Sequence, residues 1–150
     1  MKRVLVFGVF DLFHFGHLRL IKRTAKLGDY CIVAVQSDEY IIKFKPPGAT
    51  GALYSTEERI EMIRALRCVD EVITYNVVKD DIKNIDFDMY VKGSDNMHSG
   101  IIAAVKWCEE NGKEVITLPR TEGISTTYLK RLVADLEKKE SVDLEDEGES

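Results

Sequence analysis

The fold of this chain is decided by residues 4–17, which read VLVFGVFDLFHFGH. A continuous apolar run such as residues 4–7 is typical of a strand buried on both faces, as in a parallel sheet. Gly8 closes the run, and Gly16 stands between His14 and His17 at the expected start of a helix. The N–H groups of a helix N-terminus favour negative charge, and imidazoles add donors there. The stretch therefore predicts a strand, a tight turn and a site for phosphate chemistry.

Strands and helices are expected to alternate along the whole chain. The expected strands are residues 2–8, 30–35, 71–75, 87–91 and 114–118, and the expected helices are 16–27, 55–67 and 99–110, with short helical turns near 38–42 and 80–85 and an amphipathic helix around 129–136. A capping box from Ser55 to Glu58 starts one helix, while Gly28 and Gly112 end others. This order predicts an α/β fold, a single doubly wound, Rossmann-like parallel sheet of about five strands with helices on both faces.

Charge is unevenly distributed along the 150 residues, although the formal net charge is −5. Residues 140–150 hold six acidic residues and no basic one, which leaves 20 acidic and 21 basic residues in the rest of the chain. We therefore expect one domain over residues 1–139 and a disordered acidic tail over 140–150. The balanced charge of the domain argues against a nucleic-acid partner, which would need a basic surface.

The expected compartment is the cytoplasm. The chain shows no secretory leader and no apolar run near the roughly 20 residues that span a bilayer, so no membrane partner is expected. Its three cysteines are odd in number and widely spaced, which favours neither disulfides nor a zinc site. His98 is lone, and an exposed polar residue is its simpler interpretation.

Three polar segments follow predicted strands, and the carboxyl ends of parallel strands form the ligand-binding edge of such a sheet. They are the turn after the first strand, residues 92–95, and residues 120–127. A long loop, residues 37–54, brings Lys43 and Lys45 and is either functional or a solvated excursion. The histidine pair alone is equally compatible with a helix cap plus a satisfied core residue.

Two of these segments resemble known signatures. Residues 8–17 resemble the HxGH signature of the nucleotidyltransferase superfamily, and residues 120–127, which read RTEGISTT, resemble the second signature of its cytidylyltransferase family. The similarity covers about residues 2–136, and residues 55–72 most resemble the family's bacterial glycerol-3-phosphate branch. It implies a cytoplasmic, homodimeric transferase that moves CMP from CTP to a phosphorylated small molecule, with Mg²⁺ present and pyrophosphate released, and so makes a CDP-activated precursor for cell-surface polymer or lipid synthesis.

The resemblance also implies roles for individual residues. The catalytic set is His14, His17, Lys45 and Arg120; the nucleotide-binding set is Gly8, Val9, Phe10, Asp11, Gly16, Asp95, Thr121, Ile124, Ser125 and Thr126; possible acceptor or dimer contacts are Lys43, Arg59, Arg67 and Ser94. No residue is assigned as a direct metal ligand. Mg²⁺ is expected through the CTP phosphates, with Asp11 as a candidate that could equally orient a histidine or the acceptor.

Three departures from the glycerol-3-phosphate pattern concern the acceptor. Val9 replaces a small hydroxyl residue, Ser94 replaces an acidic one, and the loop over residues 43–54 is longer. The nucleotide half of the pattern is intact, so CTP is better supported than any one acceptor. Two alternatives stay open: an adenylyltransferase of the same fold, and a non-catalytic nucleotide-binding module.

Overall fold

One parallel sheet organises the molecule in a computed structural model, which describes residues 1–43, 52–94, 98–119 and 130–139. Among these residues the sheet has five strands in the order β3-β2-β1-β4-β5. They are β1 (Arg3–Gly8), β2 (Tyr30–Gln36), β3 (Glu71–Tyr75), β4 (Met89–Gly93) and β5 (Glu114–Leu118). Strand β1 is central, pairing with β2 on one side and β4 on the other. The strand order reverses at β1, so the turn after β1 lies at the switch point where doubly wound sheets bind ligands.

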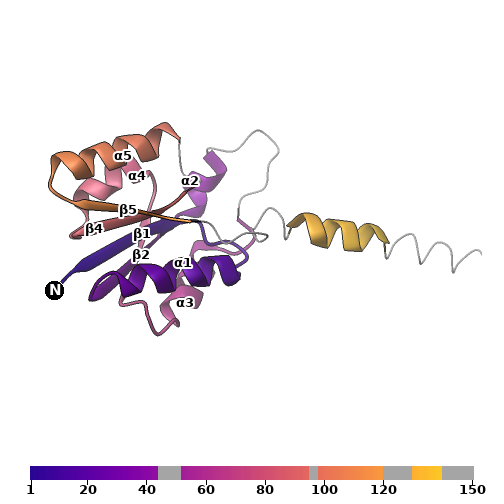
Figure 1. Ribbon diagram of the computed structural model, residues 1–150. Coiled ribbons are helices and arrows are strands. Elements are labelled where there is room, and N and C mark those ends of the chain that lie inside the picture. Colours follow the sequence, from indigo (N-terminus) through magenta and orange to yellow (C-terminus); the bar gives the residue numbers. More distant parts are fainter. Residues whose placement is uncertain (44–51, 95–97, 120–129, 140–150) are drawn as a thin grey trace, which may run out of the picture.

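Helices cover both faces of the sheet (Figure 1). The helices and helical turns are α1 (Phe15–Lys26), α2 (Asp38–Lys43), α3 (Thr56–Arg64), α4 (Val78–Asp81), η1 (Ile82–Asn84) and α5 (Ser99–Glu110), and residues 130–139 are also helical. In Figure 1, α1 and α3 lie on one face and α4 and α5 on the other, while helix 130–139 stands apart from the sheet.

Successive side chains of β1 point to opposite faces of the sheet, so the core has two layers. Val4 and Val6 pack with Ile21 of α1 and Ile63 of α3, whereas Leu5 packs on the opposite face among residues of α4, η1 and α5. All five of these side chains are essentially inaccessible to solvent. A strand whose alternate residues enter two separate cores must be apolar throughout, which explains the continuous run in the sequence.

The predicted α/β architecture and parallel sheet are confirmed. The bounds predicted for β3, β5 and α5 are also confirmed, as is the Ser55–Glu58 capping box. Gly112 follows α5 with a φ of 70°, the left-handed conformation in which glycine is favoured as a helix stop.

Three local predictions need correction. Strand β4 runs over residues 89–93 and not 87–91, because pairing with β5 extends the ladder through Lys92 to Gly93. Helix α3 ends at Arg64 and not at 67, since successive turns follow in which the Leu66 N–H donates to the Ile63 carbonyl. Gly28 follows α1 without a left-handed φ; its missing side chain instead permits close packing, because a Cβ there would lie 2.6 Å from Val4 Cγ1 and 2.8 Å from the Lys2 carbonyl oxygen.

Helix 130–139 exposes the apolar side chains of Leu132, Val133 and Leu136. Within the described parts of the chain, no helix has the length and apolar character needed to cross a membrane. The expected tail over residues 140–150 lies outside the described residues.

Candidate active site

His14 and His17 lie together where the β1–α1 turn enters α1. His14 is the N-cap of the helix, and its Nδ1 accepts a hydrogen bond from the Gly16 N–H at 3.0 Å. Three residues on, Nδ1 of His17 accepts from the His14 backbone N–H at 3.3 Å. The two rings stack with centroids 3.8 Å apart and an interplanar angle of 20°. The interpretation of His14 as a helix cap is therefore right, and it is compatible with a role in binding phosphate.

These hydrogen bonds fix the protonation pattern of both rings. A ring nitrogen that accepts an N–H bond carries no proton, so each Nδ1 is unprotonated and each neutral ring bears its proton on Nε2. Burial lowers the pKa of His17 to about 4, and repulsion from His14 adds to this effect against the opposing attraction of Asp11. At neutral pH His17 is therefore an uncharged hydrogen-bond donor through Nε2.

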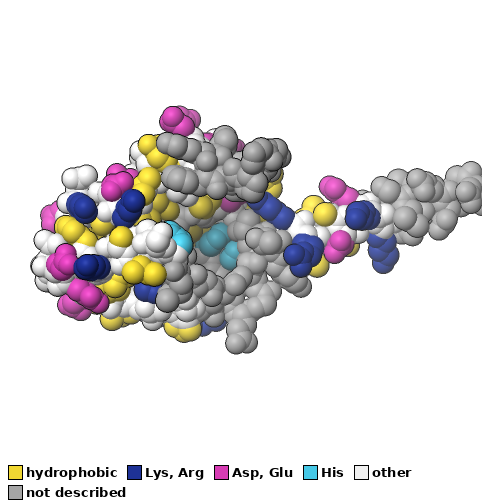
Figure 2. All heavy atoms as spheres, turned by 90° about the horizontal axis from the view of Figure 1, so that it is seen from above, with side chains coloured by type: hydrophobic (Ala, Val, Ile, Leu, Met, Phe, Trp, Pro, Cys, Tyr) yellow, Lys and Arg dark blue, Asp and Glu magenta, His cyan; other side chains and the backbone are white. Residues whose placement is uncertain are grey.

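Aromatic rings hold His17 in place. Phe10 meets the imidazole edge-on with centroids 5.4 Å apart, and Phe13 lies 5.6 Å away in a tilted arrangement. Phe10 is only 3% exposed, so its side chain supports the histidine. Figure 2 shows histidine side chains within a hollow on one face of the molecule.

The backbone that carries the pair is strained. Phe10 and Leu12 have φ angles of 56° and 46°, a left-handed region that bulky side chains rarely adopt. Such residues cost on the order of 1 kcal/mol each and persist where surrounding contacts hold them. Gly8 is required in the same turn, because a Cβ there would lie 2.6 Å from the Phe10 ring.

Asp11 lies between the two strained residues and is 4% exposed. Its Oδ2 accepts from the Leu53 N–H at 2.8 Å, and its Oδ1 accepts from the Tyr54 N–H at 3.1 Å. The ammonium of Lys130 lies 3.4 Å from Oδ2. Burial by itself would raise the pKa of Asp11, but these N–H donors and the Lys130 charge outweigh it and hold the pKa below its usual value.

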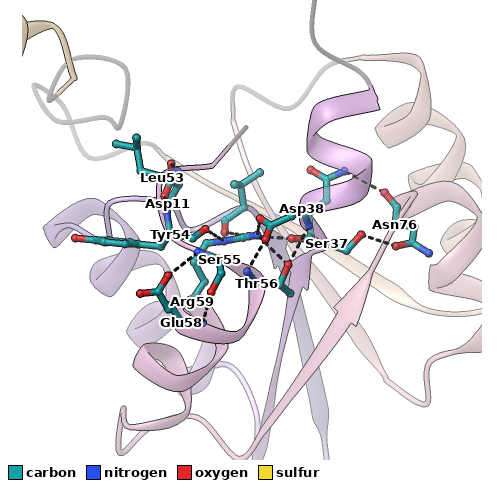
Figure 3. A network of polar contacts seen from close by, with 12 residues as sticks. Asp11, Ser37, Asp38, Leu53, Tyr54, Ser55, Thr56, Glu58, Arg59 and Asn76 are labelled. Atoms are coloured by element: carbon teal, nitrogen blue, oxygen red, sulfur yellow. Dashed lines mark hydrogen bonds and ion pairs between the residues drawn. The ribbon is translucent and has the colours of Figure 1, made fainter. Parts of the chain in front are cut away.

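Arg59 of α3 is the centre of the polar network in Figure 3. Its side chain is 0% exposed. Each of its five N–H groups has a partner within the chain, namely the carbonyls of Tyr54 (3.1 Å), Val9 (2.8 Å) and Gln36 (2.8 Å), Asp38 Oδ1 (2.6 Å) and Thr56 Oγ1 (3.4 Å). The sequence predicts an acceptor or dimer contact for Arg59. Its buried guanidinium instead joins the ends of β1 and β2 to the start of α3.

Asp38 completes this network at the start of α2. Its Oδ2 accepts from the Thr56 N–H at 2.9 Å, while its own N–H donates to Thr56 Oγ1 at 2.9 Å. Burial would raise the pKa of Asp38, but the Thr56 N–H and the Arg59 guanidinium have the larger combined effect and lower it. The roles of Asp38 and Lys130 are not predicted from the sequence. The available signal is position: Asp38 is a charged residue just after the end of β2, and Lys130 is a charged residue just after the signature segment 120–127.

The structure describes only some of the other predicted site residues. Val9 contributes its carbonyl to Arg59, Ser94 is exposed just after β4, and Arg67 is exposed after α3. Lys43 is the last residue of α2, and the position of its side chain is not described. The remaining predicted residues lie outside the described residues: Lys45, Asp95, Arg120, Thr121, Ile124, Ser125 and Thr126.

The residues that the structure describes contain no cluster of three or more His, Cys, Asp or Glu side chains suited to a metal ion. Both Asp11 oxygens accept backbone N–H groups, and one also pairs with a lysine. A carboxylate neutralised in this way is a poor direct ligand for Mg²⁺, an ion that favours anionic oxygens and retained water.

The sheet, its switch point at β1 and the donor histidines of the first strand-to-helix turn define the Rossmann-like nucleotidyltransferase class. The family model described as "Cytidylyltransferase-like" matches residues 5–132. The chain belongs to the cytidylyltransferase-like family and is a nucleotidyltransferase enzyme.

Relatives and a solved structure agree with this assignment. Glycerol-3-phosphate cytidylyltransferase of Bacillus subtilis (strain 168) is 39% identical over 139 residues, which cover 91% of this chain and 100% of that protein. Ethanolamine-phosphate cytidylyltransferase of Dictyostelium discoideum is 33% identical over 85% of this chain, which matches 35% of that longer protein. The crystal structure of the lipopolysaccharide core biosynthesis protein from Thermoplasma volcanium GSS1 has a TM-score of 0.60 and 27% identity, covering 81% of this chain and 97% of that one.

Proposed function

We propose that this enzyme transfers CMP from CTP to a phosphorylated small alcohol, with glycerol 3-phosphate as the first acceptor to test, and releases pyrophosphate. The proposal for CTP is supported by the family and by the RTEGISTT segment at residues 120–127. The proposal for glycerol 3-phosphate is supported by the 39% identity to the Bacillus subtilis enzyme along that protein's full length.

The observation that carries the proposal is the stacked pair of imidazoles at the N-terminus of α1. In the proposed reaction an acceptor phosphate oxygen attacks the α-phosphorus of CTP, a new P–O bond forms, and the bond to the pyrophosphate oxygen breaks. No protein nucleophile is needed, because positioning and charge stabilisation supply the catalysis. The Nε2–H donors of His14 and His17, together with the positive end of the helix, would stabilise negative charge as it moves onto the phosphate oxygens.

The other predicted residues keep the roles that the family resemblance gives them. Arg120 and Lys45 would supply positive charge, Ser125 and Thr126 would bind phosphate oxygens, and Asp95 would hold the nucleoside. The glycines and the main chain of residues 8–11 would approach the nucleotide closely. Mg²⁺ would enter bound to the triphosphate and be held chiefly by its oxygens and by water.

The setting of the enzyme is also part of the proposal. The three cysteines are free thiols, which fits the reducing cytoplasm. We expect a homodimer, and the exposed Arg67 remains a candidate for that contact. The acidic residues 140–150 would form a solvated tail outside the catalytic domain.

The test is pyrophosphate release with Mg²⁺ and each nucleoside triphosphate, against glycerol 3-phosphate, phosphoethanolamine, phosphocholine and phosphorylated amino acids. Turnover with CTP and glycerol 3-phosphate is the expected result. Turnover with ATP and not CTP would reassign the nucleotide, and turnover with CTP and phosphoethanolamine alone would reassign the acceptor.

A matched pair of histidine variants tests the site itself. His17→Asn should lower kcat by about 10²-fold to 10³-fold, the usual loss when one oxyanion donor is removed. His98→Asn is the control, because His98 is exposed at the start of α5 and makes no side-chain cap hydrogen bond. If His17→Asn is as active as His98→Asn and the wild-type enzyme, the proposed role of the histidine pair is refuted.

A further inference from the structure

The ion pair between Lys130 and Asp11 joins two parts of the chain that are far apart in sequence. The Lys130 ammonium lies 3.4 Å from Asp11 Oδ2, with 36% of the lysine side chain and 5% of the aspartate side chain exposed. Lys130 begins the described part of helix 130–139, whose residues 131–139 are all exposed. The partial burial of Lys130 marks where this helix meets the catalytic domain, although the rest of it stands apart in Figure 1.

Asp11 needs a cation because it is almost completely buried. A buried carboxylate is stable only when charge and hydrogen bonds compensate for lost hydration. The Leu53 and Tyr54 N–H groups supply two hydrogen bonds but no net charge. Lys130 supplies a full positive charge, and it does so at the oxygen to which Leu53 also donates.

The position of Asp11 makes this charge relevant to the histidines. Asp11 stands between Phe10 and Leu12, the two residues with left-handed φ angles, and Leu12 is two residues before His14. Strained backbone holds its conformation only if neighbouring contacts over-determine it. The contacts of Asp11 therefore fix the turn from which the histidine pair begins.

We propose that Lys130 is a positioning residue, whose pairing with Asp11 anchors helix 130–139 to the β1–α1 turn and keeps that turn in the conformation that presents His14 and His17. It acts on the reaction through Asp11. Its effect on turnover rests on the function proposed above, whereas its effect on the turn does not.

The experiment compares Lys130→Met, Lys130→Arg and, as a matched control, Lys139→Met in the full chain without ligand. Lys139 lies at the exposed far end of the same helical segment. The first measurement is amide hydrogen exchange at Leu53 and Tyr54, the N–H groups bound to Asp11. We expect exchange to be about threefold to tenfold faster in Lys130→Met, near the wild-type rate in Lys130→Arg, and unchanged in Lys139→Met, the range expected for losing one partly buried ion pair.

A second measurement follows the Asp11 carboxyl by carbon NMR as pH is varied. Because a neighbouring cation favours the ionised form, Lys130→Met should raise the pKa of Asp11 and Lys130→Arg should restore it. The third measurement is steady-state turnover. In Lys130→Met we expect the factor by which kcat falls to exceed the factor by which KM for CTP rises, because the turn is displaced while the contacts to substrate remain.

The outcomes separate this proposal from the proposed function. Unchanged amide exchange and an unchanged Asp11 pKa in Lys130→Met would overturn the positioning role. Under that result, a rise in KM alone would mean that Lys130 contacts substrate directly. If the wild-type enzyme shows no CTP turnover, the proposed function fails, while the exchange and titration results still decide the role of Lys130.

Discussion

Replacing Arg59 should destabilise the whole ligand-binding edge of the sheet. The guanidinium is buried and donates to three backbone carbonyls, those of Val9, Gln36 and Tyr54, as well as to two side chains. In Arg59→Met these carbonyls lose a charged donor at a site with no exposed surface. Each buried acceptor left unpaired costs about 1–3 kcal/mol. Asp38 contributes less, because 39% of its side chain is exposed and can regain water.

We expect Arg59→Met to lower the free energy of unfolding by about 3–5 kcal/mol, the range for breaking a buried ionic contact on one side. At about 2–4 °C per kcal/mol for a chain of this length, Tm should fall by about 10 °C. Arg59→Lys keeps the charge but has three donors on one nitrogen, so it should recover only part of the loss.

The assay is urea denaturation followed by circular dichroism, with Arg64→Met as the control. Arg64 lies on the same helix but is exposed. The control should change stability by less than about 0.5 kcal/mol, as is usual for surface substitutions. If Arg59→Met unfolds within about 1 kcal/mol of Arg64→Met, the guanidinium does not hold the edge together and our reasoning about the site is wrong.

Other predictions follow from single groups. Burial lowers the pKa of His17 from 6.5 to about 4, so as pH falls the unfolded chain takes up this proton at a higher pH than the folded chain does. The contribution of His17 to the free energy of unfolding should therefore be fully present above about pH 6.5 and should fall by about 3 kcal/mol toward pH 4. Histidine proton NMR should give the low pKa, and His17→Asn should flatten the dependence of stability on pH. Gly28→Ala should cost about 1–3 kcal/mol in urea denaturation, since the new Cβ would press on Val4 and on the Lys2 carbonyl. Gly112→Ala meets open space, so its φ of 70° should limit the cost to about 1 kcal/mol.

The fold could be predicted because each strand carries its own pattern. The central strand β1 is apolar at successive positions, and the capping box of α3 and the glycine after α5 mark helix ends locally. The sequence predicts strand β4 two residues too early, because its last residues, Lys92 and Gly93, are held by pairing with β5. Ladder pairing is a non-local property, and neither residue carries a strand signal of its own.

The site could be predicted only where a motif is contiguous. The pairing of His14 with His17 follows from their spacing at a helix start. The backbone groups that donate to Asp11 are 42 and 43 residues away, and the partners of Arg59 include one that is 50 residues away. Sequence patterns report on residues that are close together in the chain. They therefore identify Asp11 and Arg59 as candidate site residues, but they do not reveal that Asp11 binds the backbone at residues 53 and 54 or that Arg59 is buried.

The contacts of Arg59 also explain how the loop between α2 and α3 could change in length without disturbing the histidines. Arg59 binds Asp38 at the start of α2 and the Tyr54 carbonyl just before α3, so one side chain holds the chain on both sides of residues 44–51. Asp11 also holds the flank that follows residues 44–51, because its carboxylate accepts a hydrogen bond from the Tyr54 N–H. Because both flanks are fixed to the β1–α1 turn, a change in the length of the intervening loop need not move His14 or His17.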